Sequence, residues 1–158
     1  MTTTPLPSAQ IWPYITELIR SSRVPTYCAF PFLAAGALEL LPLREGDMLM
    51  VKASDQGVRS TMTDLDVLAA FVGWGVEVRS VDSLHAKMVV AKRRVVIGSM
   101  NASRRSAEGP SEVATVTTDK TLVTEARSFI KGCRSFPLVD MGFIEGTRER
   151  LQLDGGDR

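Results

Sequence analysis

Short apolar segments alternate with amphipathic ones through the middle of the chain, and this alternation constrains the fold more than any other feature. Residues 47–54 form a brief apolar run between Gly46 and polar residues, which predicts a buried strand. Residues 61–72 have the spacing of an amphipathic helix, and residues 75–82 alternate as a strand does. This order predicts an α/β fold, with a mixed β-sheet flanked by helices on both faces.

The other segments extend the same pattern in both directions. We expect helices at 8–22, 34–41 and 119–132, and strands at 26–33, 84–91, 95–101 and 112–118. Residues 1–7 are expected to be disordered, residues 8–136 to form one domain, and residues 137–158 to form a C-terminal extension that is helical around 144–152. A length of 158 residues fits a single domain.

Composition excludes several classes of protein. The formal net charge is +1, which argues against a nucleic-acid binder held by bulk charge but leaves room for a local basic patch. Cys28 and Cys133 have no metal-ligand spacing and are expected to be buried or half-buried thiols in a reducing compartment. No signal peptide or membrane-spanning run is evident, so we expect a cytoplasmic protein without a membrane partner.

The segment 84–103 concentrates the residues that suit chemistry. It contains the single histidine of the chain, His85, with Lys87 two residues later and Gly98-Ser99-x-Asn101 beyond a basic turn. It has no Asp or Glu. Side chains alternate along a strand, so His85 and Lys87 point the same way, as do Ser99 and Asn101.

The length of the turn decides whether the two pairs share a face. If residues 92–94 form a three-residue loop, Ala91 pairs with Val95, and the four polar side chains lie in opposing pairs: Lys87 with Ser99, and His85 with Asn101. Opposing Cβ atoms would be roughly 5 Å apart. A two-residue loop would shift the register by one and split the pairs onto opposite faces. A shared patch requires the three-residue loop, and we take it as the expectation.

Such a patch suits phosphoryl chemistry. An imidazole serves as a nucleophile or an acid–base near neutral pH, and a lysine binds an anion such as phosphate. Serine hydroxyl and asparagine amide groups donate hydrogen bonds to anionic oxygens. Because no cluster of Asp, His or Cys supplies a metal site, we expect neither a metal nor a cofactor.

His85-x-Lys87 followed by Gly98-Ser99-x-Asn101 resembles the signature of the phospholipase D superfamily. The resemblance covers roughly residues 46–132 and implies a phospholipase D-like catalytic domain. Glu112 opens a strand in the region where the small nucleases of the superfamily carry a glutamate that orients the histidine. Two departures stand out: Lys92 occupies the position of a usual aspartate, and the interval from there to Gly98 is one residue shorter than usual.

The resemblance implies a two-step phosphoryl transfer in which His85 attacks phosphorus and a second histidine acts as acid and then as base. One chain carries one histidine, so the second would come from another subunit of a C2 homodimer. Lys87 and Asn101 of both chains would hold the phosphate, with support from Ser99, and Glu112 would orient the imidazole. Taken alone, His85 would more often be a surface or core histidine, and Glu112 an ordinary strand-end charge.

The basic residues near the motif indicate the class of substrate. Five of them are candidate substrate-binding residues on adjacent loops: Lys92, Arg93, Arg94, Arg104 and Arg105. A basic rim suits a polyanionic backbone, which favours a nuclease over a phospholipid phosphodiesterase. For residues 92–94, a solvated turn is an equally good interpretation. The departure at Lys92 keeps open a second hypothesis, a degenerate family member that binds nucleic acid or a protein without cutting.

Overall fold

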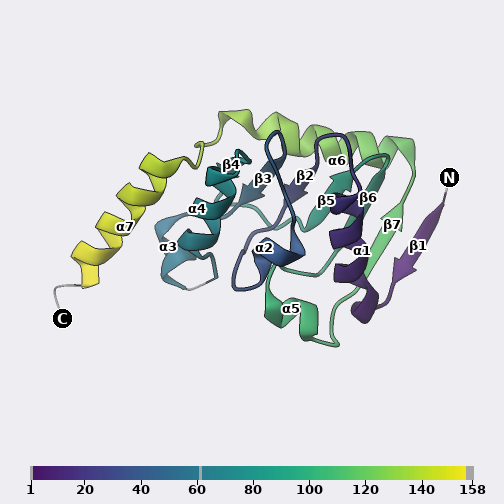
Figure 1. Ribbon diagram of the computed structural model, residues 1–158, viewed down its shortest axis with the longest axis horizontal. Helices are drawn as coiled ribbons and strands as arrows, with labels where there is room; N and C mark the ends of the chain where they lie inside the picture. Colours follow the sequence, from purple (N-terminus) through teal and green to yellow (C-terminus); the bar gives the residue numbers. More distant parts are fainter. Residues whose placement is uncertain (1, 61, 156–158) are drawn as a thin grey trace.

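The computed structural model describes residues 2–60 and 62–155, and these fold around one sheet (Figure 1). The strands are β1 (Thr3–Leu6), β2 (Tyr27–Ala29), β3 (Met48–Val51), β4 (Glu77–Ser80), β5 (Met88–Ala91), β6 (Arg94–Gly98) and β7 (Ala114–Thr117). The helices are α1 (Ser8–Arg20), α2 (Ala37–Leu40), α3 (Asp55–Arg59), α4 (Leu65–Gly73), α5 (Arg104–Glu108), α6 (Lys120–Gly132) and α7 (Met141–Gly155), with a 3₁₀ turn at Cys133–Ser135.

The sheet is mixed and its strand order is β1-β7-β6-β5-β2-β3-β4. Strands β2, β3 and β4 are parallel, whereas the pairs β2–β5, β5–β6, β6–β7 and β1–β7 are antiparallel. This topology confirms the predicted α/β class with a mixed sheet.

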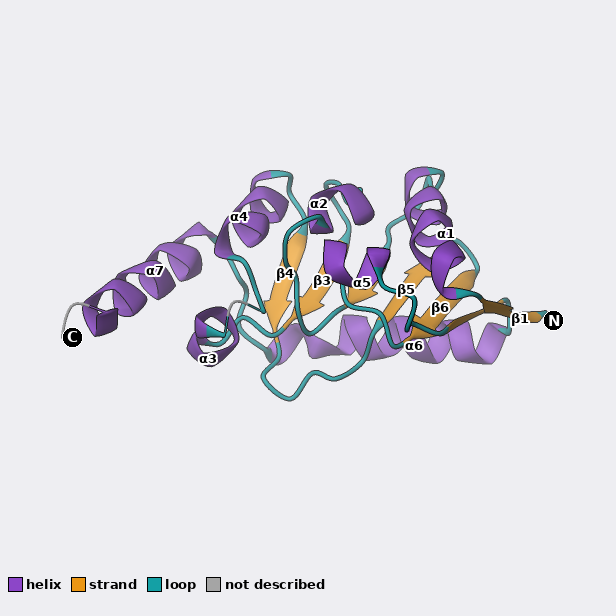
Figure 2. Ribbon diagram, turned by 90° about the horizontal axis from the view of Figure 1, so that it is seen from below, coloured by secondary structure: helices purple, strands orange, loops and turns teal. Residues whose placement is uncertain are grey.

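Helices cover both faces of the sheet (Figure 2). Helices α1, α2, α4 and α5 lie on one face, where the larger core includes Ile11, Ile15, Phe30, Leu68 and Phe71. Helix α6 crosses the other face, and its Val123, Ala126 and Ile130 pack on a smaller core. The alternation of buried side chains along β5 explains the division, because Val89 faces one core and Val90 the other.

The two ends of the sheet differ, and we name them for what they carry. At the cluster end β2, β3, β4 and β6 finish while β5 and β7 begin, since Ala29 pairs with Met88 and Gly98 with Ala114. At the turn end β5 passes into β6. In Figure 1 the cluster end lies toward α5 and the turn end toward α6.

The β5–β6 turn corrects the expected register. Ala91 pairs with Arg94 and Met88 with Ile97, so the loop has two residues, Lys92 and Arg93. The expectation of a three-residue loop that pairs Ala91 with Val95 is wrong. Lys92 takes the left-handed conformation, with φ 56°, which lets a two-residue turn follow the twist of the strands without a glycine or asparagine.

The N-terminal segment is a second correction. Residues 1–7 were expected to be disordered, but Thr3–Leu6 form the edge strand β1 against β7; Met1 lies outside the described residues. Pro5 is compatible with this role because an edge strand does not need every N–H group for the ladder. The pairing is stabilised by a hydrogen bond between the hydroxyls of Thr3 and Thr117 at 2.8 Å.

Four helices differ from the prediction, two in their bounds and two because they were not expected. Helix α4 begins at Leu65 because Asp64 caps it by accepting from the N–H groups of Asp66 and Val67; Thr61, in the expected range, lies outside the described residues. The short helices α3 and α5 were not predicted, and serines cap both. Helix α7 is longer than the expected 144–152, and residues 156–158 of the predicted extension lie outside the described residues.

Both cysteines are free thiols, Cys28 buried and Cys133 half-buried, as expected. Burial raises the pKa of the Cys28 thiol well above its ordinary value, and the nearby Asp47 carboxylate raises it further. Burial also raises the pKa of Cys133. The structure therefore gives neither cysteine the lowered pKa of a reactive thiol.

Candidate active site

His85 lies in the irregular segment that leads into β5 at the cluster end. Leu84 precedes it and is buried in the smaller core, which fixes the backbone, while the His85 side chain is exposed. Lys87 is half-buried as a residue, and its ammonium donates to the His85 carbonyl at 3.3 Å. An exposed histidine, with a cation bonded to its backbone carbonyl, therefore lies in a segment anchored by a core leucine.

Gly98 ends β6 where there is no room for a side chain. A Cβ atom at this position would lie 2.4 Å from the Val113 carbonyl oxygen and 2.6 Å from the Ala114 Cβ. The Gly98 N–H donates to the Lys87 carbonyl at 3.2 Å, and the Ser99 N–H donates to the Val113 carbonyl at 2.9 Å. The glycine thus lets three strands converge directly beside Lys87.

Ser99 and Glu112 form the centre of a hydrogen-bond network. The Ser99 hydroxyl donates to one oxygen of the Glu112 carboxylate, and the Ser106 hydroxyl donates to the other at 2.8 Å. The Glu112 N–H donates to the Ser8 hydroxyl at 3.3 Å, so the start of α1 also holds this residue. Both oxygens of the carboxylate are therefore used to join the end of β6 to α5.

Asn101 is held by its backbone and has an unpaired side-chain oxygen. Its N–H donates to the Ser106 hydroxyl at 3.1 Å. Its Oδ1 atom is buried and has no hydrogen-bond partner among the described residues. A buried, unpaired polar atom is an exception in folded proteins, and such exceptions are found at functional sites.

The structure brings the five predicted catalytic residues to the same end of the sheet, but by a different arrangement from the expected one. Lys87 lies across from Gly98, so the expected opposition of Lys87 to Ser99 and of His85 to Asn101 is wrong. The residues meet because the chain leaves strand geometry at both places: residues 84–87 and 99–101 are irregular. Among the described residues no hydrogen bond joins Glu112 to His85, so an orienting role for Glu112 stays a prediction.

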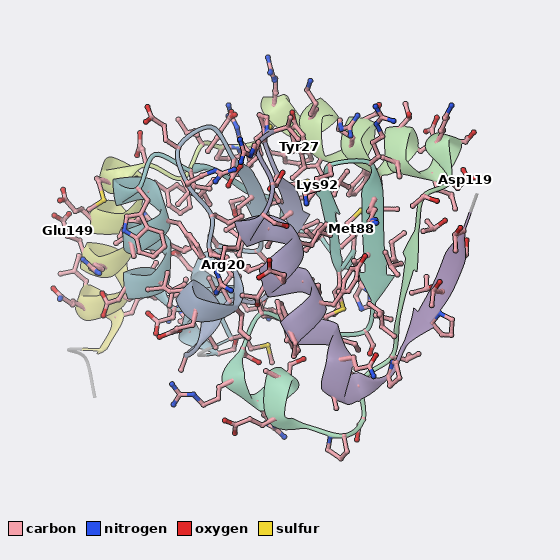
Figure 3. All side chains as sticks on the ribbon, turned by 45° about the vertical axis from the view of Figure 1, so that its right-hand side comes forward. Arg20, Tyr27, Met88, Lys92, Asp119 and Glu149 are labelled. Carbon is pink, nitrogen blue, oxygen red and sulfur yellow. The ribbon has the colours of Figure 1, made fainter. Side chains whose placement is uncertain are left out.

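The predicted basic rim does not form one surface. Arg104 and Arg105 are exposed at the start of α5, at the cluster end. Lys92, Arg93 and Arg94 lie at the turn end, at the opposite end of β5 from His85. Figure 3 shows Lys92 close to Tyr27, with Met88 further along the strand. The expectation that all five flank the motif on adjacent loops is wrong, and their role in binding stays a prediction.

Sequence reasoning missed Ser8 and Ser106, which support Glu112. Ser106 is seven residues beyond Ser99 and its N–H donates to Ser103, the cap of α5, at 3.2 Å. The spacing of Ser103 and Ser106 was the available signal, because a serine before a short polar segment favours a helix start. Nothing local in the sequence connects Ser8 to residues a hundred positions later.

Within residues 2–60 and 62–155, no three His, Cys, Asp or Glu side chains gather as a metal site would require. The same part of the chain contains no helix that is long and apolar enough to span a membrane. The cluster thus offers a nucleophile, a cation, hydroxyl groups, an amide and a carboxylate. These are the groups that a phosphate diester needs around it.

Comparisons with known proteins agree with this chemistry. A family model described as "Cardiolipin synthase, PLD-like domain" matches residues 47–133, which is more than half of the chain. A search of curated proteins found no match.

Solved structures share the fold at low sequence identity. Nuc from Salmonella typhimurium, described as a phospholipase D family member, has a TM-score of 0.68 at 12% identity, over 88% of this chain and 97% of its own. NucT from Helicobacter pylori has a TM-score of 0.65 at 13% identity, over 89% of this chain and 99% of its own. A phosphatidylserine synthase from Haemophilus influenzae has a TM-score of 0.59 at 12% identity, and the match covers 95% of this chain and 44% of the synthase. With the family match over residues 47–133 and the fold in common, this chain belongs to the PLD-like domain family of the phospholipase D superfamily.

Proposed function

We propose that this chain hydrolyses nucleic-acid phosphodiesters without a metal, as an endonuclease, through a phosphohistidine formed at the interface of a homodimer. The observation that carries the proposal is the cluster end itself. There an exposed His85 stands beside Lys87, next to the Ser99–Glu112–Ser106 network that holds Asn101. Family membership makes phosphodiester chemistry the appropriate class.

In the first step, an imidazole nitrogen of His85 forms a bond to phosphorus while the bond from phosphorus to the leaving oxygen breaks. The leaving oxygen takes a proton from the partner's His85. Lys87 and the Asn101 amide hold the charged oxygens of the phosphoryl group as negative charge develops on them. Glu112 keeps the segment from Ser99 to Asn101 in place through its bonds to Ser99 and Ser106.

In the second step, the partner's His85 removes a proton from water. The water oxygen attacks phosphorus, the phosphorus–nitrogen bond breaks, and the phosphate product leaves with His85 restored. Each histidine has one task in each step, so one histidine in an isolated chain is not sufficient.

An exposed apolar patch beside the site supports the dimer. Helix α6 does not cover the cluster end of its face, where Ile97 is 39% and Val113 is 66% exposed. Ile97 is two residues from Val95, which packs under α6, so both lie on that face. Val113 accepts from Ser99, so the patch adjoins the site. Apolar side chains in this position suit a second copy of the chain.

The location of Lys92 weakens the hypothesis of a non-cutting family member. Its ammonium donates to the Ser21 hydroxyl at 2.9 Å, at the far end of the hairpin from His85. A lysine in place of the usual aspartate therefore changes the turn end of the sheet and leaves the residues around His85 in place.

The test is hydrolysis in EDTA of single- and double-stranded DNA, RNA, a small phosphodiester and a phospholipid, by the wild type and by His85→Ala. We expect nucleic acid and the small diester to be cut by the wild type, and the rate to fall by at least about 10³-fold in His85→Ala. Cleavage that requires Mg²⁺ or persists in the variant would contradict the proposal, and exclusive cleavage of the phospholipid would assign a different substrate.

A mixing experiment tests the second histidine. Wild type and His85→Ala are unfolded and refolded together at varied ratios, so that subunits exchange at random. If two histidines form one site, the total activity falls as the square of the wild-type fraction, to about one quarter in an equal mixture. A linear decrease would show that each chain acts alone. His85→Gln serves as a second variant in case the alanine variant does not fold.

A further inference from the structure

A basic groove lies at the turn end of the sheet, away from the cluster. It has a volume of about 760 Å³ and is formed by the loop between α1 and β2, the start of β2, the β5–β6 turn and α6. Five cationic side chains and one aromatic ring line it: Arg23, Lys92, Arg93, Arg127, Lys131 and Tyr27. These residues come from three distant parts of the sequence, so their gathering is a product of the fold.

The charge of the groove is not balanced by the protein. Among its lining residues in the described chain there is no Asp or Glu. None of its five cations forms an ion pair within that part of the chain, whereas Arg59, Arg148 and Arg150 each pair with an aspartate elsewhere. The whole chain has a net charge of +1, so the groove is a local concentration of positive charge. Cations left unpaired in a concave surface attract an anionic ligand.

Three of the cations are held in position before any ligand arrives. The Arg127 guanidinium donates to the Lys92 carbonyl at 3.1 Å and lies 6.0 Å from the centre of the Tyr27 ring. The Lys131 ammonium lies 5.8 Å from the same ring. The Lys92 ammonium is also fixed, by Ser21. Such preorganisation reduces the entropy that binding costs.

We propose that this groove is a second binding site for a single nucleic-acid strand, separate from the catalytic cluster. Several phosphates in sequence match five cations better than one isolated anion would, and the half-buried Tyr27 offers a ring against which a base or sugar can pack. The choice of nucleic acid as the polyanion rests on the function proposed above.

The spacing between the two sites sets a length for the ligand. Lys92 follows His85 by seven residues, which corresponds to at most about 23 Å of extended chain. A strand with the phosphate spacing of a duplex would need roughly seven nucleotides to cover that distance. Short oligonucleotides can therefore occupy one site, and longer ones can contact both.

The experiment measures binding in EDTA of a labelled strand of about 20 nucleotides, as DNA and as RNA, by fluorescence anisotropy at several salt concentrations. All proteins carry His85→Ala, so nothing is cut. One adds Arg127→Ala with Lys131→Ala. A matched control adds Lys120→Ala with Arg134→Ala, which removes two exposed cations that do not line the groove, one at the start of α6 and one in the 3₁₀ turn that follows it.

We expect the groove pair to weaken binding by roughly 10- to 30-fold at about 0.1 M salt and to reduce the slope of log K against log salt by about 1.4. The control pair should change affinity less than about twofold. A second groove pair, Arg23→Ala with Arg93→Ala, changes exposed loop residues and repeats the test if the first pair unfolds.

Equal weakening by the groove pair and the control pair would overturn the proposal, because bulk charge would then explain the binding. Unchanged binding in both groove pairs would also overturn it, as would groove-dependent binding to phosphatidylglycerol vesicles without binding to either oligonucleotide. Binding is measured without hydrolysis, and hydrolysis of the small diester by the wild type tests the proposed function separately. Failure of the groove proposal would appear in the binding measurements, and failure of the proposed function would appear in the hydrolysis of the small diester.

Discussion

The two ends of the β5–β6 hairpin both carry polar and charged residues, but in different arrangements. At the cluster end, a network of polar groups is formed: Glu112 accepts from Ser99 and Ser106, and Asp55 of α3 pairs with Arg150 of α7, while the Asn101 Oδ1 has no partner among the described residues. At the turn end, the cations of the groove have no acidic partner within the described chain. The first arrangement fixes geometry, as chemistry requires, and the second leaves charge available, as binding requires.

The largest expected effect comes from placing a charge on an exposed apolar residue at each end of the hairpin, Val113 at the cluster end and Val24 at the turn end. Val113→Lys places a charge in the patch beside Ser99 and should convert the proposed dimer to a monomer, with at least about 100-fold loss of hydrolysis. Val24 is 50% exposed in the groove, and Val24→Lys should leave the mass in solution unchanged at that of the proposed dimer. Mass in solution and activity are measured together. A monomeric wild type, or an active Val113→Lys monomer, would contradict the two-chain site.

The next effect tests whether the Glu112 network positions the site. Glu112→Gln keeps the shape but replaces one acceptor oxygen with a donor facing a serine hydroxyl. We expect kcat for the small diester to fall by up to about 100-fold while KM changes little. Glu108→Gln makes the same change at an exposed residue of α5 and should have no effect. A loss confined to KM, or an equal loss in both variants, would mean that the network does not position the site.

The crowding at Gly98 predicts a loss of stability at the cluster end. Gly98→Ala forces a Cβ against the Val113 carbonyl and should lower the free energy of unfolding by about 2–3 kcal/mol. Gly132→Ala, where a Cβ meets nothing within 4 Å and the backbone is helical, should be neutral or stabilising. Urea denaturation measures both. Equal stability of the two variants would show that the strands separate at little cost.

The smallest effect concerns the paired cation at the cluster end. The hydrogen bond from Arg150 holds the pKa of Asp55 below its ordinary value. A lowered pKa in the folded state stabilises the fold above the unfolded pKa of about 3.9, and this contribution is lost as the pH falls through the folded pKa. Arg150→Gln should therefore lower Tm at pH 7 by at most about 2 °C, because the pair is exposed, and the difference from the wild type should shrink as the pH falls through the folded pKa of Asp55. A difference that persists in acid would mean that packing of α7 is responsible.

The sequence was sufficient for the class of fold and for the superfamily. Strand and helix periodicities predicted the central elements, and the spacing of His85, Lys87, Ser99 and Asn101 indicated the superfamily that the family match confirms. These features are local or carried by a motif, so one chain displays them directly.

The rest depends on contacts between distant residues. The two-residue turn relies on a lysine in a left-handed conformation, which costs about 1–2 kcal/mol and carries no sequence signal such as glycine. Arg127 donates to the carbonyl of that lysine and Ser21 accepts from its ammonium, and neither partner is near it in sequence. Helix α5 likewise depends on a serine cap within a polar segment that resembles a loop. The conformations of the β5–β6 turn and of α5 therefore depend on tertiary contacts that the local sequence does not show.

The edge strand β1 has a consequence for the order in which the molecule assembles. Thr3 and Thr117, which are bonded across β1 and β7, are 114 residues apart in the chain. Closing so long a loop costs chain entropy, and few contacts offset that cost until β5, β6 and β7 have formed the sheet edge that β1 joins. During synthesis β1 therefore emerges before the other strands of the sheet but can pair only after β7 has formed. A nascent chain would present the bare edge of β7 to its surroundings until β1 has paired with it.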